Sequence, residues 1–202
     1  ISLDSVIHTS KPRAHSVSGD KRLDLGLMQG ALTLPIRCGT AHELFSYFDL
    51  DKARGMGRIW TGETCRFPSN SNQCPDKKLV DNHSGVDYAG LWDTPIVAGM
   101  PGRVTAIDTV FNMVTLRNQE VQLTVTYGHN NQVLVKKGDW VKRGDVIATM
   151  GSKGTSNVHV HVSHYDLSRD AEHPPDVDPY RDVADPNSGS LWTVDNKPQC
   201  VH

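Results

Sequence analysis

"NVHVHVSHYD", residues 157–166, holds three of the ten histidines of this 202-residue chain within six positions. Valine alternates with the first two of them, and strict alternation over a short β-branched run predicts a strand. Successive side chains of a strand point to opposite faces, so His159 and His161 project the same way, about 7 Å apart. His164 is expected on the opposite side or at the strand end. The valines that should face a hydrophobic core are Val158, Val160 and Val162.

Similar short runs surround this strand from His83 onward, separated by Gly, Asn and Asp turn signals. Such spacing predicts an antiparallel, β-rich domain. Gly-Asp occurs at 138–139 and again at 144–145, which indicates two tight turns, and the basic residues around them are interpreted as solvated turn charges. The runs are GRVTAID (102–108), NMVTLRN (112–118), VQLTVTYGH (121–129), NQVLVKKG (131–138) and DVIATMG (145–151).

Residues 1–79 have a different character, because they are irregular and rich in Gly, Pro, Ser and Asn. We expect them to form an N-terminal extension packed on the domain that follows. The one plausible helix is "TAHELFSYFDLDKA", residues 40–53, with Thr40 as its N-cap. Its apolar face would consist of Leu44, Phe45 and Phe48.

Composition excludes several classes of protein. Lys+Arg 21 against Asp+Glu 23 gives a net charge of -2, and without a long basic block the chain is not expected to bind nucleic acid. No apolar run approaches the roughly 20 residues of a membrane-spanning helix. The start, "ISLDSVIHTSKPR", lacks the apolar region of a signal peptide, and the first residue is Ile1, which predicts a processed product or an excised piece of a longer chain.

Four cysteines stand at wide spacing, with no CxxC pair among them. An even number so spaced favours two disulfides and an oxidising compartment. Cys65 and Cys74 would close the shortest loop, which leaves Cys38 to pair with Cys200 and to tie the extension to the C-terminus. Four reduced, buried cysteines are the alternative.

Three more polar residues suggest a metal site. His83 and Asp87 stand four apart in "NHSGVDYAG", and Gly85 between them allows a sharp bend that would let both meet one ion. His129 ends an alternating strand in "TVTYGHN". Each could instead be an ordinary loop or surface residue. Together with the strand histidines they supply what a catalytic zinc site needs, and the absence of HExxH excludes the helix-borne arrangement.

In order and spacing these motifs resemble those of the lysostaphin or LytM-like family of zinc metalloendopeptidases, which cut peptide bonds in bacterial peptidoglycan. The family's HxxxD matches "HSGVD", its Tyr-x-His matches "YGH" and its HxH matches "HVH". The resemblance covers residues 80–184 and implies a mainly β fold, an antiparallel β-sheet groove built from a duplicated hybrid motif. Residues 185–202 would form a disulfide-tied tail. The chain departs from the family at Asn157, usually Gly, and at His164, where an acidic residue is usual.

Residue by residue, the resemblance implies that His83, Asp87 and His161 bind Zn²⁺. Strand periodicity alone does not distinguish the two strand histidines, and the family pattern selects the second as the ligand. His129 and His159 would then be the catalytic pair that the metal leaves free. Bound zinc acidifies water and polarises a carbonyl, while the two histidines move protons or steady the developing oxyanion.

The implied function is zinc-dependent hydrolysis of peptide cross-links in bacterial peptidoglycan, by a monomer that is secreted or periplasmic. A non-catalytic relative that binds the cell wall or activates a hydrolase is the alternative, although this chain retains all five residues. A lipoyl- or biotinyl-type carrier is disfavoured because its Met-Lys-Met hairpin is absent. The motifs leave open whether a glycine bridge or a D-amino-acid stem is cut. They also leave open whether this is a remodelling enzyme, a phage lysin or a toxin with an immunity or delivery partner.

Overall fold

Two antiparallel β-sheets form the described part of the computed structural model, which comprises residues 30–46, 48, 83–168, 176–177, 179, 191–192 and 199–202. The larger sheet contains, in spatial order, β1 (His42–Ser46), β2 (Gly85–Gly90), β10 (His159–Asp166), β6 (Leu123–Gly128), β5 (Met113–Asn118), β4 (Gly102–Asp108) and β8 (Trp140–Val141). The smaller sheet contains β3 (Pro95–Val97), β9 (Val146–Met150) and β7 (Asn130–Val133).

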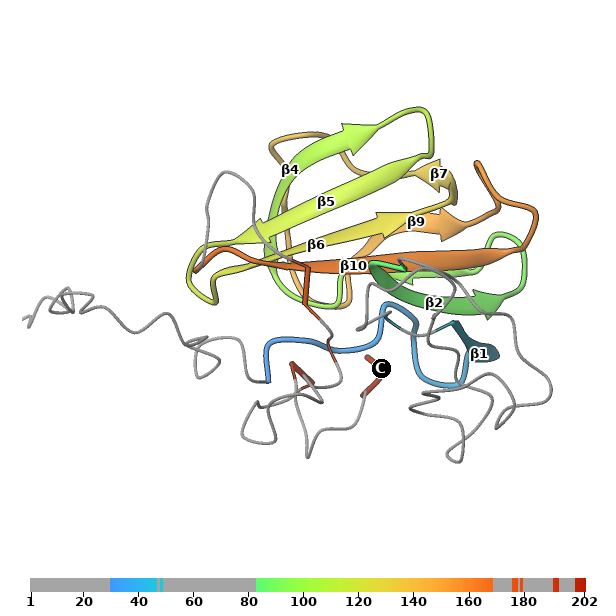
Figure 1. Cartoon of the computed structure of the whole chain (residues 1–202), viewed down its shortest axis with the longest axis horizontal. Coiled ribbons are helices and arrows are strands. Elements are labelled where there is room, and N and C mark those ends of the chain that lie inside the picture. Colours follow the sequence, from blue (N-terminus) through green and yellow to red (C-terminus); the bar gives the residue numbers. More distant parts are fainter. Residues whose placement is uncertain are drawn as a thin grey trace, which may run out of the picture.

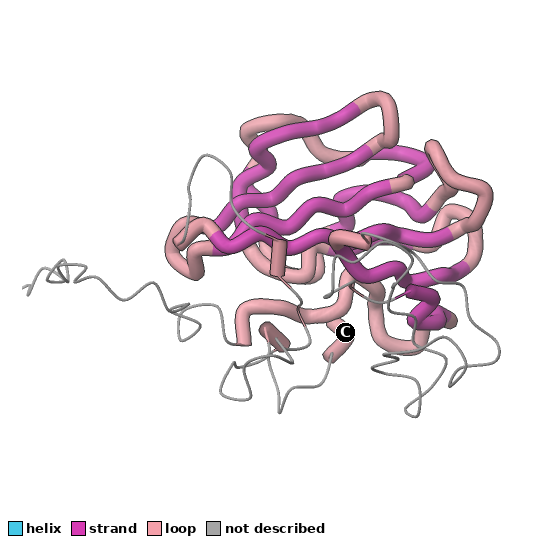
Figure 2. Tube along the Cα trace, in the orientation of Figure 1, coloured by secondary structure: helices cyan, strands magenta, loops and turns pink. Residues whose placement is uncertain are grey.

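Every pairing between these strands is antiparallel, which confirms the predicted mainly β fold. Figure 2 shows strands and loops but no helix among the described residues. Within that part of the chain no helix is long and apolar enough to cross a membrane.

Strand β10 lies inside the larger sheet, between β2 and β6 (Figure 1). As the alternation predicted, Val160 and Val162 are buried in the hydrophobic core and Val158 packs against it. His164 lies on this same core side of the strand and is also buried. The opposite side of β10 carries His159 and His161.

One hydrophobic core joins the two sheets and the segment before β1. Its members include Val125 and Tyr127 of β6 and Ile147 of β9, all of them 0–1% exposed. Leu32 and Ile36 belong to the same core, so the segment that contains them packs on the sheets. The predicted domain limits at 80 and 184 lie outside the described residues.

The helix predicted for residues 40–53 is wrong over its described part, since β1 occupies His42–Ser46. The register shifts between Leu44 and Ser46, so Ser46 lies opposite Asp87, on the other face of the sheet. Leu44 pairs with the core residue Tyr88 and is half-buried against the core, and Phe48 is buried in it. The same apolar residues had also suggested a helical face. Pairing with β2, from His42 opposite Gly90 to Ser46 opposite Asp87, satisfies backbone groups that a short helix would have satisfied internally. This long-range pairing overrides a weak local preference.

The two Gly-Asp turns lie where the sequence predicted them. Gly138 and Gly144 have φ values of 98° and 85°, a region that favours glycine. In each turn the aspartate that follows the glycine accepts a hydrogen bond from a lysine backbone N–H, Asp139 from Lys136 and Asp145 from Lys142, both at 2.8 Å. The two turns therefore repeat one local structure.

A disulfide joins Cys38 to Cys200, as predicted. Backbone hydrogen bonds support it on both sides, from Leu34 to Gln199 and from Cys38 to Val201. Figure 1 shows the described segment before β1 and the C-terminus close together beside the larger sheet. The predicted pair Cys65–Cys74 lies outside the described residues.

Burial of His164 predicts acid sensitivity of the fold. Desolvation, with a smaller contribution from His161, lowers the pKa of His164 from 6.5 to about 3. In the unfolded chain the same ring is protonated below about pH 6.5. Its contribution to stability is therefore complete above that pH and is lost as the pH falls towards 3, by at most about 1.4 kcal/mol per pH unit.

Chemical denaturation between pH 7 and pH 4 measures this slope. We expect His164→Leu to reduce the decline in the free energy of unfolding relative to wild type. His202→Leu, at an exposed position, is the matched control and should decline like wild type. An unchanged slope in His164→Leu would contradict the assignment.

Candidate metal centre

The register of four neighbouring strands brings polar residues into one row across the larger sheet. Ser46 of β1 pairs with Asp87 of β2, Asp87 pairs with His161 of β10, and His161 pairs with Gly128 of β6. Paired residues of antiparallel strands point to the same face. Segments far apart in the chain therefore converge on the face opposite the core.

Two further histidines flank this row from outside the strands. His83 lies two residues before β2, and His129 follows directly after β6. His129 has φ 63°, an uncommon left-handed conformation for a non-glycine residue. Its backbone N–H donates to Phe111 O at 3.1 Å, and its ring Nδ1 is 2.7 Å from Lys153 O, so these contacts hold the strained residue in place.

His83, Asp87 and His161 form a tight triangle of potential ligand atoms. Asp87 Oδ1 is 3.1 Å from His83 Nε2 and 2.8 Å from His161 Nδ1, and the two nitrogens are 3.1 Å apart. Tetrahedral zinc with bonds of about 2.0–2.1 Å places its ligand atoms roughly 3.3 Å apart. With small adjustments the three residues therefore fit one metal ion.

The far ring nitrogens of both histidines meet serine hydroxyls. His83 Nδ1 is 3.0 Å from Ser46 Oγ, and His161 Nε2 is 2.8 Å from Ser163 Oγ. Such partners set the tautomer and the ring orientation of a metal-binding histidine. This arrangement directs one nitrogen of each ring at Asp87.

Electrostatics keep the carboxylate of the triangle charged. Burial alone would raise the pKa of Asp87, but hydrogen bonds with His161 and His83 outweigh it and hold that pKa well below its usual range. An ionised carboxylate together with two imidazole nitrogens is a donor set suited to a divalent cation.

His159 and His129 lie beside the triangle. Their ring centroids are 4.9 Å apart. His159 Nε2 is 3.7 Å from Asp87 Oδ1, farther from that oxygen than His83 Nε2 or His161 Nδ1. Burial lowers the pKa of His159, partly opposed by Asp87. Its imidazole is therefore neutral near pH 7 and can accept a proton. His159 Nδ1 is held 3.0 Å from Asn157 O.

Gly85 does not form the sharp bend that the sequence suggested, but it has another role in the site. It is the first residue of the extended strand β2, and its missing side chain makes room for the His161 ring. A Cβ built at Gly85 would lie 2.6 Å from Val162 O and 2.7 Å from two atoms of that ring. The glycine is required because another strand approaches closely.

We expect Gly85→Ala to displace His161, lowering stability by about 1–3 kcal/mol and zinc affinity by roughly 10–100-fold. Gly128→Ala is the matched control on the other side of His161, since its Cβ would meet only ordinary contacts at 3.5 Å and beyond. Zinc titration and thermal unfolding of both variants measure the difference. Equal zinc affinity in the two variants would contradict the steric role of Gly85.

Sequence reasoning missed the two serines. Ser163 follows His161 by two strand positions, so period-2 alternation could have placed it on the same face. Ser46 had no such signal, because it lay within the predicted helix and its approach to His83 depends on the pairing of β1 with β2. The backbone carbonyls of Lys153 and Asn157 likewise carry no mark in the sequence.

Comparison with known proteins connects this geometry to a family. The family model described as Peptidase family M23 matches residues 81–174. The chain is 39% identical over 79 residues to "Lipoprotein NlpD" of Yersinia enterocolitica, over 37% of this chain and 80% of that protein. It is 35% identical over 97 residues to "Murein hydrolase activator NlpD" of Salmonella dublin, over 43% of this chain and 26% of that protein. The matched part of the chain thus spans about a quarter of the length of the Salmonella dublin protein.

A solved structure shares the fold. The catalytic domain of the prophage-encoded M23 protein EnpA from Enterococcus faecalis, crystallised as a mutant, aligns with a TM-score of 0.51 at 22% identity. The alignment covers 74% of this chain and 96% of that one. Sequence and fold together show that the chain belongs to peptidase family M23, as a lysostaphin- or LytM-like member.

Proposed function

We propose that the chain is a zinc-dependent endopeptidase that hydrolyses peptide cross-links of bacterial peptidoglycan. The single observation that carries the proposal is the triangle of His83, Asp87 and His161 with two further histidines beside it. A site that only stored metal would have no need of a second pair of imidazoles at its edge.

The proposed ligands are His83 Nε2, Asp87 Oδ1 and His161 Nδ1. When bound there, zinc supplies Lewis-acid chemistry, which acidifies water and polarises the scissile carbonyl. Ser46 and Ser163 keep the two ligand rings in their orientation by hydrogen bonds.

The proposed catalytic pair divides the proton transfers. His159 is neutral near pH 7 because burial lowers its pKa, so it is suited to accept a proton from the attacking water. His129 is less buried and is oriented by Lys153 O, which leaves its Nε2 side to stabilise the oxyanion or protonate the leaving amine. Their 4.9 Å separation allows both rings to contact one tetrahedral centre.

We further propose that the protein works in the cell envelope, on peptidoglycan. One relative is named as a murein hydrolase activator and another as a lipoprotein. The Cys38–Cys200 disulfide fits an oxidising compartment. Cell-wall peptides would bind at the face of the larger sheet that carries the polar row with Asp87 and His161.

The second candidate function is activation of another murein hydrolase, because the Salmonella dublin relative carries that name. An activator would act through protein contacts and would need no metal. The five residues of the proposed active site would then be dispensable.

Digestion of purified sacculi separates the two functions. An endopeptidase releases new amino groups from sacculi when loaded with zinc, and it stops when a chelator is added. An activator releases none alone but accelerates an added murein hydrolase, with or without the chelator. Metal analysis of the same sample, expected to give one zinc per chain, completes the test.

A further inference from the structure

Two arginines and a tryptophan form a second row on the larger sheet. Arg117 of β5 pairs with Arg103 of β4, and Arg103 pairs with Trp140 of β8. The three side chains therefore point to the same face from adjacent strands. Trp140 is 56% exposed, which is unusual for so large an apolar side chain.

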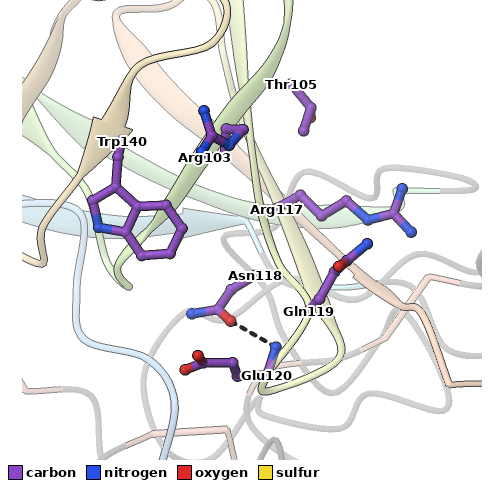
Figure 3. Close-up of a pocket in the computed structure, with 7 residues that line it drawn as sticks. All are labelled: Arg103, Thr105, Arg117, Asn118, Gln119, Glu120 and Trp140. Carbon is purple, nitrogen blue, oxygen red and sulfur yellow. Dashed lines mark hydrogen bonds between the residues drawn. The ribbon is translucent and has the colours of Figure 1, made fainter.

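The row lines a pocket of about 430 Å³ (Figure 3). In the figure the indole stands on one side of the pocket and the polar hairpin residues stand below it. The residues that complete the lining are Thr105, Asn118, Gln119 and Glu120. An aromatic face beside polar and cationic groups is typical of a site that takes a polar ligand.

Charge in this pocket is not neutralised from within. Arg103 and Arg117 are directly opposite each other, and such like charges on neighbouring strands repel. No ion pair among the described residues involves either arginine, so no carboxylate offsets this repulsion. Arg117 Nε is buried without a hydrogen-bond partner there. Glu120 contributes one carboxylate, so the lining keeps a net charge of +1 and attracts an anion.

Arg103 is already oriented for binding. Its guanidinium donates to Gly138 O at 2.8 Å, in the turn that leads into Trp140. This bond keeps the arginine beside the indole and lowers the entropic cost of ligand binding.

The pocket opens on the same face as the metal centre. Ser163, two positions after His161, pairs with Thr126, and Thr126 pairs with Thr115. The hydroxyl groups of Thr115 and Thr126 are 3.0 Å apart, so both point to this face. Arg117 follows Thr115 by two strand positions. Strand spacings place the pocket roughly 15–20 Å from His161 along the sheet.

We propose that Arg103, Arg117 and Trp140 form a binding site for a glycan segment of the cell-wall polymer together with the stem-peptide carboxylate beside it, distant from the bond that is cut. The guanidinium groups bind the carboxylate and the indole supports a sugar ring. The proposal rests on the proposed function for its choice of polymer. A linear substrate held at both points would lie across the sheet face.

Sedimentation with purified sacculi, stripped of accessory polymers and kept in a chelator so that nothing is cut, tests the site. We expect Arg103→Gln/Arg117→Gln to bind roughly tenfold more weakly than wild type, and Trp140→Ala to bind more weakly as well. Lys137→Gln/Lys142→Gln removes two exposed charges from the neighbouring turns and is the matched control. It should bind like wild type.

Sacculi whose carboxyl groups have been amidated identify the ligand. Amidation should weaken the binding of the control variant to sacculi, while the binding of the arginine variant should not fall further. Equal binding of the arginine variant and the control, or an equal loss of both on amidation, would overturn the proposal. So would binding by wild type only to sacculi that retain phosphate-rich accessory polymers.

Two safeguards keep these outcomes interpretable. If the glutamine variant fails to fold, Arg103→Lys/Arg117→Lys replaces it, with weaker binding expected because lysine lacks the bidentate fork. Binding is measured without metal, so it is independent of cleavage. If the chain never cleaves peptidoglycan but needs both arginines for binding, the endopeptidase proposal is refuted and the binding site still stands.

Discussion

Asp87→Ala is expected to lose zinc and to lose peptidoglycan cleavage together. The carboxylate is the one anionic group of the triangle, and its Oδ1 is the atom that both histidine nitrogens approach, at 3.1 and 2.8 Å. Loss of a group that merely supports a metal ligand costs about 10–100-fold in affinity or activity, so loss of the ligand itself should cost more than about 100-fold. Metal analysis after dialysis and the release of amines from sacculi measure both effects.

Glu43→Gln is the matched control for this variant, because it removes an exposed carboxylate from the neighbouring strand β1. It should keep both zinc and activity. Asp87→Ala is expected to lower stability, because it removes hydrogen bonds that outweigh the burial cost of the carboxylate, so thermal unfolding checks that the variant is folded. Zinc bound at wild-type affinity by folded Asp87→Ala would refute the proposed ligand set.

His129→Ala and His159→Ala are expected to have the opposite signature, retaining zinc while the rate of cleavage falls. General acid–base catalysis contributes about 10²–10⁴-fold, so each variant should lose activity in that range, with the loss in kcat. His159 lies near Asp87 but outside the triangle, and His129 approaches the proposed ligand His161 only to a ring separation of 5.9 Å.

His42→Ala is the control, since His42 is an exposed histidine at the edge of the sheet. The double variant His129→Ala/His159→Ala should lose less than the product of the two single losses if both rings serve one transition state. Loss of zinc from His159→Ala would show instead that this residue is a ligand. Unchanged cleavage by both single variants would refute the proposed catalytic pair.

The alternation of β10 could be predicted from residues 157–166 because a strand's period is a local property of the backbone. It placed the valines in the core and the two histidines on the other face. The motif order around it indicated the family. The helix over residues 40–53 was wrong because a short apolar run fits both periods, and only the pairing with β2 favours the strand.

Other parts of the site have no local signal. Gly85 is needed because the His161 ring approaches it from another strand, and Ser46 reaches His83 only through the β1–β2 register. The left-handed backbone of His129 depends on contacts with Phe111 and Lys153. Each of these features depends on contacts between segments that are far apart in the sequence.

The sequence by itself determined which residue types alternate, where the tight turns lie and which histidines and aspartate are candidates for metal chemistry. Only the tertiary structure decided that Asp87, His161 and Ser46 share one row, and that Arg103, Arg117 and Trp140 share another on the same face. The physical reason is that side-chain direction follows from local backbone geometry, whereas register is set by hydrogen bonds and core packing between distant strands.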